Sequence, residues 1–184
     1  MMLRLIDDVN KALDAECYFS ALALALTFPD ICGKAEYPEE KMTSQRYKAW
    51  YDKYIGKYEQ CPCEKCREIK MPYLSGEVVY SLRNSLLHQG TPNIDVDKIQ
   101  DNNNKIDSFE LILESKKPFD IYHDAAEIYN ERTKRYRVNV RRLCIILCRS
   151  TRAYYETNRD KFNFFRYSII DWDSEVNKMR DLGF

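Results

Sequence analysis

An arginine, an asparagine and a histidine stand close together in a segment with helical periodicity. Arg83 and Asn84 are adjacent, and four residues separate Arg83 from His88. A guanidinium offers a fork of donors to phosphate oxygens, and an imidazole takes up and releases protons near neutral pH. These residue types can therefore hold a phosphate group and move a proton beside it.

The segment that carries them has the best-marked helix boundaries in the chain. Ser75 is a plausible N-cap and Gly90 follows the last periodic residue, so we expect a helix from about Ser75 to His88. His88 follows Asn84 by four positions, about one helical turn, whereas Arg83 lies about 140° from His88. We therefore expect Asn84, rather than Arg83, to contact the imidazole ring.

This predicted helix has apolar residues on two sides. One arc forms a core-facing stripe made of Val78, Val79, Leu82 and Leu86. Tyr80 and Leu87 lie on the opposite arc, which a second surface must cover. A second copy of the chain is the simplest partner, and two-fold symmetry would bring two copies of Arg83 and His88 together. We therefore expect a homodimer built on this helix.

The pattern Arg83-Asn84-x-x-x-His88, late in a helix of a small and mainly helical protein, resembles the Arg-x(4–6)-His signature of HEPN domains (higher eukaryotes and prokaryotes nucleotide-binding). Members of this family are helical bundles that dimerise and bring two signatures together. The active members are metal-independent endoribonucleases of prokaryotic toxin, antiviral and RNA-processing systems. The resemblance therefore implies a single-stranded RNA substrate, no cofactor, and a catalytic role for Arg83, Asn84 and His88.

The resemblance also implies a division of labour among the three residues. His88 would accept or donate the proton, Arg83 would hold the phosphate as charge builds on it, and Asn84 would orient the ring or the substrate. The products would carry a 2′,3′-cyclic phosphate and a 5′-hydroxyl, and DNA would not be cut. Some family members bind without cleaving, so a non-catalytic HEPN-like binding module is the alternative function.

One position departs from part of the family. HEPN toxins that are controlled by a nucleotidyltransferase antitoxin often have tyrosine two residues after the histidine, and this chain has Gly90 there. We therefore do not expect that mode of control. The simpler interpretation of the whole pattern is a surface cation and a helix C-terminal cap.

A run of basic residues between positions 132 and 152 contains no acidic residue. The whole chain balances 29 Lys and Arg against 29 Asp and Glu, so bulk charge does not favour nucleic acid. The local surplus predicts an RNA-phosphate track at Arg135, Arg137, Arg141 and Arg142. The alternative is that these arginines are solvated positions around a buried apolar stripe.

Three of the seven cysteines crowd together at Cys61, Cys63 and Cys66. A Cys-x-x-Cys pair lets two thiolates reach one zinc ion, but a structural site needs four ligands and the fourth is missing locally. We therefore predict no metal, with zinc at these cysteines as the weaker alternative to free thiols. The odd cysteine count argues against a disulfide framework and predicts a reducing cytoplasm.

Length and composition predict a single domain over residues 1–184. The chain is 45% hydrophobic, which is enough for one compact core. Its most apolar stretch, Tyr18 to Phe28, is about half the length that a bilayer-spanning helix needs, and acidic residues precede it. We therefore expect neither export nor a membrane partner.

Periodicity predicts a mainly α fold, an HEPN-like helical bundle with a small β-hairpin insertion at about residues 106–124. The expected elements are a long helix from Leu3 to Leu26 that Phe28-Pro29 ends, a turn at Cys32-Gly33, an aromatic helix from Ser44 to Tyr58, a polar surface loop from Thr91 to Lys105, hairpin strands beginning at Phe109 and Phe119, a strand that ends near Asn139 and feeds a long helix, and a short amphipathic piece from Asp173.

Overall fold

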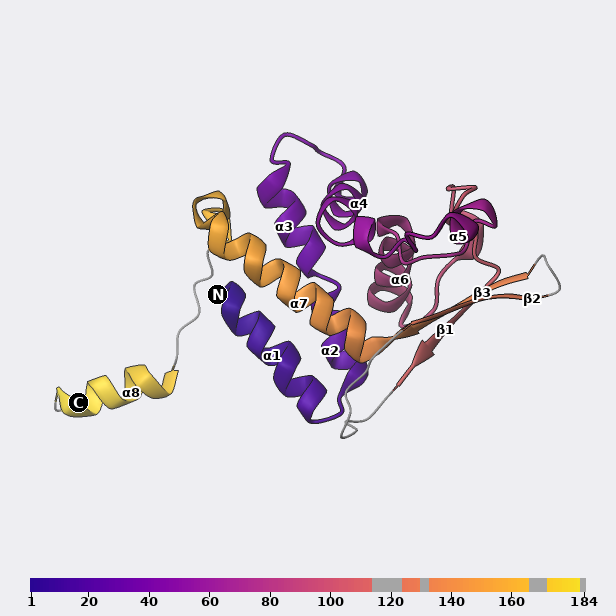
Figure 1. The fold of residues 1–184 in the computed structure, drawn as a ribbon. Helices are drawn as coiled ribbons and strands as arrows, with labels where there is room; N and C mark the ends of the chain where they lie inside the picture. The colour runs from indigo at the N-terminus through magenta and orange to yellow at the C-terminus, as the bar shows by residue number, and fades with distance from the viewer. Residues whose placement is uncertain (114–123, 130–132, 166–171, 183–184) are drawn as a thin grey trace.

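The computed structural model describes residues 1–113, 124–129, 133–165 and 172–182, and it is mostly helical with a small three-stranded sheet (Figure 1). The mainly α prediction is confirmed at this level. The α-helices are α1 (Met2–Asp14), α2 (Tyr18–Ala25), α3 (Phe28–Glu36), α4 (Thr43–Tyr54), α5 (Glu64–Glu68), α6 (Gly76–Gln89), α7 (Val140–Thr157) and α8 (Trp172–Asp181). The described residues also form three short 3-10 helices, η1 (Gly56–Tyr58), η2 (Val96–Lys98) and η3 (Arg159–Phe162), and the strands β1 (Ser108–Ile112), β2 (Ala125–Tyr129) and β3 (Thr133–Asn139).

The predicted long N-terminal helix is wrong, because the chain breaks between α1 and α2. Glu16 has a positive φ of 57°, which ends α1, and Cys17 behind it is exposed. Both helices nevertheless pack against α7. The helical repeat of apolar residues therefore runs through two separate helices. Helix α1 buries the first residues of that repeat, Ile6, Val9 and Leu13.

Pro29 begins a helix rather than ending one. It lies in the first turn of α3, where a backbone N–H would have no hydrogen-bond partner within the helix, so proline loses nothing there. Cys32 and Gly33 are buried inside α3 and form no turn. A Cβ atom added at Gly33 would lie 2.7 Å from the backbone oxygen of Arg46 on α4, so only glycine permits the close approach of these two helices.

Helix α4 forms the aromatic centre of the molecule, as its sequence predicts. Tyr47, Trp50 and Tyr51 are fully buried, and α4 packs between α3 and α6. A hydrogen bond joins α4 to the first residue of α6, since the N–H of Gly76 donates to Asp52 Oδ1 at 2.7 Å. Helix α4 therefore sets the distance between α3 and α6.

The sheet has the order β1-β3-β2, with β1 parallel and β2 antiparallel to β3. Strand β1 lies beside β3, with Phe109 opposite Tyr136, and the predicted hairpin between β1 and a following strand stays a prediction. The predicted second strand from Phe119 lies outside the described residues. The antiparallel pair is β2 with β3, and β3 leads directly into α7 at Asn139, as predicted. The side chain of Asn139 accepts a hydrogen bond of 3.1 Å from the N–H of Arg142.

The polar segment from Thr91 to Lys105 is more than a surface loop. Asn104 is 0% exposed, accepts a hydrogen bond from the N–H of Tyr73 (2.8 Å), and donates to the Tyr73 carbonyl and the Ser75 hydroxyl (3.0 Å each). The N–H of Asp95 donates to Ser81 Oγ at 3.0 Å. This segment therefore fastens the beginning of α6 and covers one of its sides.

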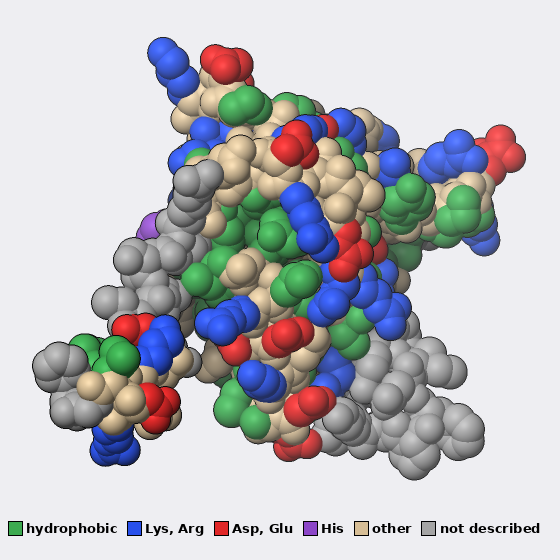
Figure 2. Space-filling view, turned by 90° about the vertical axis from the view of Figure 1, so that its left-hand side faces the viewer, with side chains coloured by type: hydrophobic (Ala, Val, Ile, Leu, Met, Phe, Trp, Pro, Cys, Tyr) green, Lys and Arg blue, Asp and Glu red, His purple; other side chains and the backbone are tan. Residues whose placement is uncertain are grey.

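Charged side chains of both signs are mixed over the face shown in Figure 2, around hydrophobic side chains gathered near its centre. This distribution fits a chain with no net charge. Within the described part of the chain, no helix has both the length and the apolar character that crossing a membrane requires.

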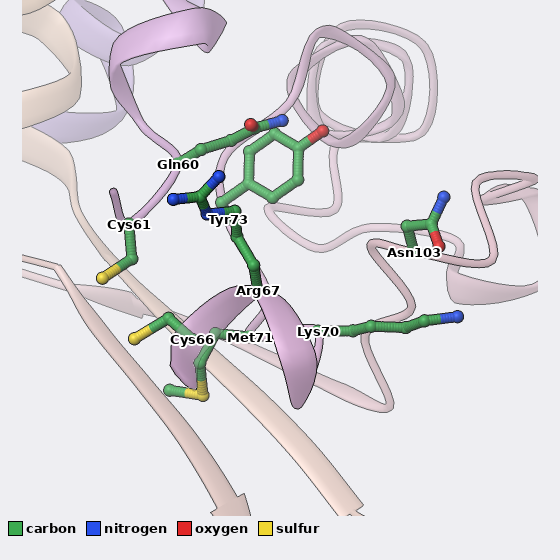
Figure 3. A pocket seen from close by; sticks show the side chains of 8 residues that line it. All are labelled: Gln60, Cys61, Cys66, Arg67, Lys70, Met71, Tyr73 and Asn103. Atoms are coloured by element: carbon green, nitrogen blue, oxygen red, sulfur yellow. The ribbon is translucent and has the colours of Figure 1, made fainter. Parts of the chain in front are cut away.

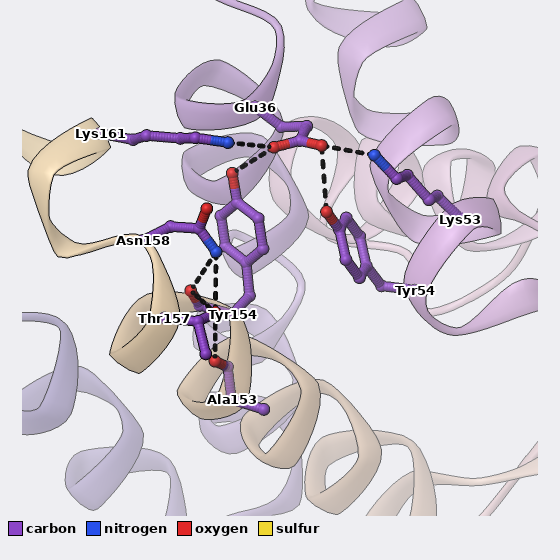
Figure 4. Close-up of polar contacts among 8 residues, drawn as sticks. All are labelled: Glu36, Lys53, Tyr54, Ala153, Tyr154, Thr157, Asn158 and Lys161. Carbon is purple, nitrogen blue, oxygen red and sulfur yellow. Dashed lines mark hydrogen bonds and ion pairs between the residues drawn. The ribbon is translucent and has the colours of Figure 1, made fainter.

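Glu36 joins the ends of three helices through four donors (Figure 4). Lys53 and Tyr54 of α4 donate to its Oε1, while Tyr154 of α7 and Lys161 of η3 donate to its Oε2 at 2.8 Å each. Burial by itself raises the pKa of Glu36, but the hydrogen bonds outweigh burial and lower this pKa to about 2. The ionised carboxylate therefore stabilises the folded chain.

We expect Glu36→Gln to lower the free energy of unfolding at pH 7 by about 1–3 kcal/mol, because the amide leaves its lysine partners without a counter-charge. The pKa is depressed in the folded state, so the stabilisation is present above the ordinary glutamate pKa of about 4.3 and is lost as the pH falls towards 2. Urea unfolding between pH 7 and pH 2 measures the gap between the two proteins, which should close over the acidic part of this range. Exposed Glu39→Gln is the control, and a gap that does not change with pH would contradict this role.

Candidate active site on helix α6

Helix α6 begins and ends where its sequence predicts. The Ser75 hydroxyl accepts a hydrogen bond of 3.4 Å from the N–H of Val78, and Gly90 takes the left-handed conformation with a φ of 67° just after the helix. Arg83, Asn84 and His88 lie in its second half. The structure brings these three side chains together.

Arg83 is the centre of the cluster. Its Nη1 donates to Asn84 Oδ1 at 3.0 Å and contacts His88 Nε2 at 2.8 Å. The imidazole partner is therefore Arg83 and not Asn84, contrary to the prediction from helical angles. The reason is the length of the arginine side chain, which lets its guanidinium reach around the helix surface.

The cluster includes an acidic residue that the sequence did not indicate. Asp30, in the first turn of α3, accepts from Arg83 Nε at 3.0 Å and from Nη2 at 2.9 Å through the same oxygen. Both side chains are 18% exposed. Burial raises the pKa of Asp30, while the charge and hydrogen bonds of Arg83 oppose that rise. Fifty-three positions separate the two residues, and no local pattern connects them.

The second apolar side of α6 is covered mainly by the same chain, which corrects the expectation for Tyr80. The Tyr80 ring packs edge-on against Tyr47 of α4, with ring centroids 5.1 Å apart. The Tyr47 hydroxyl and Asp30 Oδ1 are buried without a hydrogen-bond partner among the described residues. On this side Leu87, next to His88, stays 37% exposed. One apolar side chain beside the cluster therefore stays partly exposed.

The hydrogen bonds fix what the cluster can do. A guanidinium has only donors, so His88 Nε2 must accept, and the ring keeps a lone pair at this atom. Four of the five N–H groups of Arg83 are used by Asp30, Asn84 and His88. The exposed imidazole can therefore act as a base once another acceptor takes its place on Arg83.

A polar cavity of about 490 Å³ opens beside Asn84. Ser85 and Gln89 line it from α6, and Lys48 and Asp97 line it from facing segments. The cavity has the size of a small-molecule site. Charged residues of both signs and several neutral hydrogen-bonding groups line it.

The predicted RNA track loses Arg141, which is buried inside the bundle. Its side chain is 3% exposed, and its Nη2 donates to the Leu13 carbonyl at 2.9 Å and to the Tyr18 hydroxyl at 3.3 Å. Its guanidinium also lies over the Tyr18 ring. This residue ties α7 to α1 and α2, so the prediction that it contacts RNA is wrong.

Arg142 is also held within the chain. Its Nη2 lies 2.9 Å from both carboxylate oxygens of Glu59, and its Nη1 donates to Asp124 at 2.7 Å. The carboxylates of Glu59 and Asp124 are themselves almost completely buried. The Arg142 guanidinium, which we expected to contact an RNA phosphate, is therefore paired with these two carboxylates.

The two sheet arginines of the predicted track are paired across strands. Arg137 donates to Glu110 on β1 at 2.8 Å and to Glu127 on β2 at 3.3 Å, while Arg135 lies 3.8 Å from Glu110. The acidic partners come from other segments, which explains why a run without acidic residues does not make an exposed basic surface. Arg135 and Arg137 keep about a third of their side-chain surface exposed.

The structure also brings Cys61, Cys63 and Cys66 together, with their three sulfur atoms within 4.8 Å of one another. This cluster lies on the segment before α6. No family model, curated protein or solved structure matches the chain.

We expect Arg142→Met to lower the free energy of unfolding by about 3–5 kcal/mol, because Glu59 and Asp124 would remain as buried charges without their partner. Urea unfolding at pH 7 measures the loss. Arg149→Met removes an exposed arginine from the same helix and should change stability by less than about 0.5 kcal/mol. Equal stability of the two variants would mean that Arg142 is not a structural residue.

Proposed function

We propose that this protein is a metal-independent endoribonuclease of HEPN type that cleaves single-stranded RNA as a homodimer. The observation that carries the proposal is the guanidinium of Arg83, which Asp30 holds from one side and which presents its Nη1 to Asn84 and His88 on the other. This arrangement joins a phosphate-binding group to a proton-transfer group at the protein surface.

The hydrogen bonds suggest an order of events. An RNA phosphate oxygen replaces His88 as an acceptor on Arg83 and releases the Nε2 lone pair. His88 then takes the proton of the ribose 2′-hydroxyl, and the 2′-oxygen attacks the phosphorus. The bond from phosphorus to the 5′-oxygen breaks, and the leaving oxygen receives a proton. The products are a 2′,3′-cyclic phosphate and a 5′-hydroxyl, with Arg83 neutralising the charge that builds on the phosphate.

A dimer supplies the second proton-transfer group. Two-fold symmetry about α6 would place His88 of the partner subunit on the opposite side of the phosphate, where it gives the proton to the leaving oxygen. Exposed Leu87 lies beside His88 and is the apolar contact available to such a partner. The polar cavity next to Asn84 would receive a neighbouring nucleoside.

Asp30 would be a positioning residue in this reaction. It holds two N–H groups of Arg83 through one oxygen and so fixes the plane of the guanidinium. The substrate need not order a flexible side chain, which lowers the entropy cost of reaching the transition state.

A non-catalytic HEPN-like binding module is the second candidate. The observation that favours it is that Arg83 already satisfies most of its donors within the chain, which is what a structural ion pair between α3 and α6 would do. The two candidates share the fold and differ in whether RNA is cut.

We infer a reducing cytoplasm as the location, in a prokaryotic defence, toxin or RNA-processing system. The support for the compartment is that all seven cysteines are free thiols. The support for the system is the family resemblance alone.

We expect the purified protein to cut a labelled single-stranded RNA of mixed sequence in the presence of EDTA, leaving 5′-hydroxyl ends that a polynucleotide kinase can phosphorylate. His88→Gln keeps an acceptor for Arg83 but removes the proton-transfer group, so its rate should fall by about 10²-fold or more while stability and oligomeric state are unchanged. Gel analysis of the products and size-exclusion chromatography measure both.

Two further samples define the outcome. Lys11→Ala, which removes an exposed charge from α1, should cut normally, and the all-deoxy version of the substrate should stay intact. RNA binding without cutting by the unmodified protein would favour the binding module. Normal cutting by His88→Gln would refute the proposed site.

We expect Asp30→Asn to lower kcat for RNA cleavage by about 10- to 100-fold with a smaller change in KM, because a neutral amide holds Arg83 less firmly in its reactive orientation. Steady-state kinetics on the same RNA separates the two constants, and urea unfolding reports stability independently. Asp8→Asn, an exposed change on α1, is the control. A loss of stability with unchanged kcat would make Asp30 purely structural.

A further inference from the structure

Residues 60–70, between η1 and the buried residues that precede α6, bury no hydrophobic side chain. Helix α5 is five residues long and buries none of them, and every residue from 60 to 70 except Cys66 is exposed. A helix this short is not stable in water without tertiary contacts. Some other interaction must hold this segment in one conformation.

Three thiols converge at this place. The sulfur atoms of Cys61, Cys63 and Cys66 lie within 4.8 Å of one another, and the Cys61 and Cys63 sulfurs are 3.4 Å apart. Thiolates bound to one tetrahedral zinc ion at about 2.3 Å lie roughly 3.8 Å from each other. The cluster therefore needs only a small adjustment to surround an ion.

We propose that Cys61, Cys63 and Cys66 bind one Zn²⁺ ion as three thiolate ligands and that this ion holds the segment in place of a hydrophobic core. Metal binding by thiolates supplies folding free energy in small segments that cannot bury apolar surface. The ion is structural and takes no part in the proposed RNA chemistry, so the two proposals stand independently.

The backbone around the cluster already has the shape that a metal loop requires. The N–H of Cys66 donates to Cys63 Sγ at 3.2 Å, which is the type of hydrogen bond that stabilises a thiolate. Arg67 donates to the Pro62 carbonyl, and the N–H of Met71 donates to the Cys66 carbonyl, both at 2.9 Å. These contacts close the loop on both sides of the sulfurs.

Three thiolates would leave one position of a tetrahedral ion for a further ligand. No carboxylate or imidazole of the described residues joins the three sulfurs within the same distance. A cavity of about 170 Å³ lies beside Cys61 and Cys66, with Arg67 and Lys70 on its walls (Figure 3). A water molecule would complete the tetrahedron.

A redox dithiol is the competing explanation for crowded cysteines, but it uses two sulfurs and leaves the third without a role. The distance of 3.4 Å between Cys61 and Cys63 is a non-bonded contact. The convergence of three sulfurs favours the metal.

The experiment is a titration of the full chain with Co²⁺, which substitutes for Zn²⁺ and is visible by absorption, in an oxygen-free reducing buffer. We expect a thiolate-to-cobalt charge-transfer band and the d–d bands of a tetrahedral site, with saturation at one Co²⁺ per chain. Stoichiometric Zn²⁺ should abolish both. Zn²⁺ should also slow proteolytic cleavage between residues 60 and 71.

Cys63→Ser should weaken Co²⁺ binding by about tenfold or more, because one of the three ligands is lost. Cys17→Ser, which removes an exposed cysteine outside the cluster, should give the spectrum of the unmodified protein. Far-ultraviolet circular dichroism confirms that each variant is folded, and Cys66→Ser replaces Cys63→Ser if that variant is not.

Three outcomes would overturn the proposal. The first is the absence of a charge-transfer band, and the second is an unchanged spectrum in the folded variant. The third is quantitative oxidation of Cys61 and Cys63 to a disulfide without any binding of metal by the reduced protein, which would assign the cluster to redox chemistry. Failure to cut RNA affects none of these measurements and concerns the proposed function alone.

Discussion

The ion pair between Asp30 and Arg83 is the interaction on which the candidate site depends. Each charge is largely removed from water, and neither would be tolerated there without the other. The pair can form because α3 lies against α4 without a side chain at Gly33, one turn after Asp30, while α4 in turn packs on α6. The close contact between α3 and α4 therefore helps to decide where the guanidinium points.

The helix of the site was predictable because its signals are local. The N-cap Ser75, the C-terminal Gly90 and the apolar stripe all lie within one short segment, and each has the role that its residue type favours. The partner of Arg83 was not predictable, because Asp30 reaches it only through the packing of α3, α4 and α6. The contact between Arg83 and His88 was missed for a different reason, since angles on a helical wheel describe Cβ positions and not the reach of a long side chain.

The same distinction explains the errors elsewhere in the fold. Periodicity identified the apolar faces of α1 and α7 but not the break at Glu16, because two consecutive helices can continue one repeat. Composition identified strand-forming segments but not their pairing, which depends on contacts between distant segments. The run of basic residues is present, but Glu59 and Glu110, which lie elsewhere in the sequence, form ion pairs with arginines of that run. The number of basic residues in the run therefore overestimates the positive charge that these residues present at the protein surface.

The hydrogen bonds of Arg83 give the proposed site a built-in order. While the guanidinium donates to His88 Nε2, the lone pair needed for proton abstraction is occupied. Only an acceptor that competes for the same N–H group can release it, and a phosphodiester oxygen is a stronger acceptor for a guanidinium than a neutral ring nitrogen, because it carries charge. Substrate binding and activation of the base are then one event. The fixed contact with Asp30 is what makes this exchange possible, since it keeps the guanidinium in place while its partner on Nη1 changes.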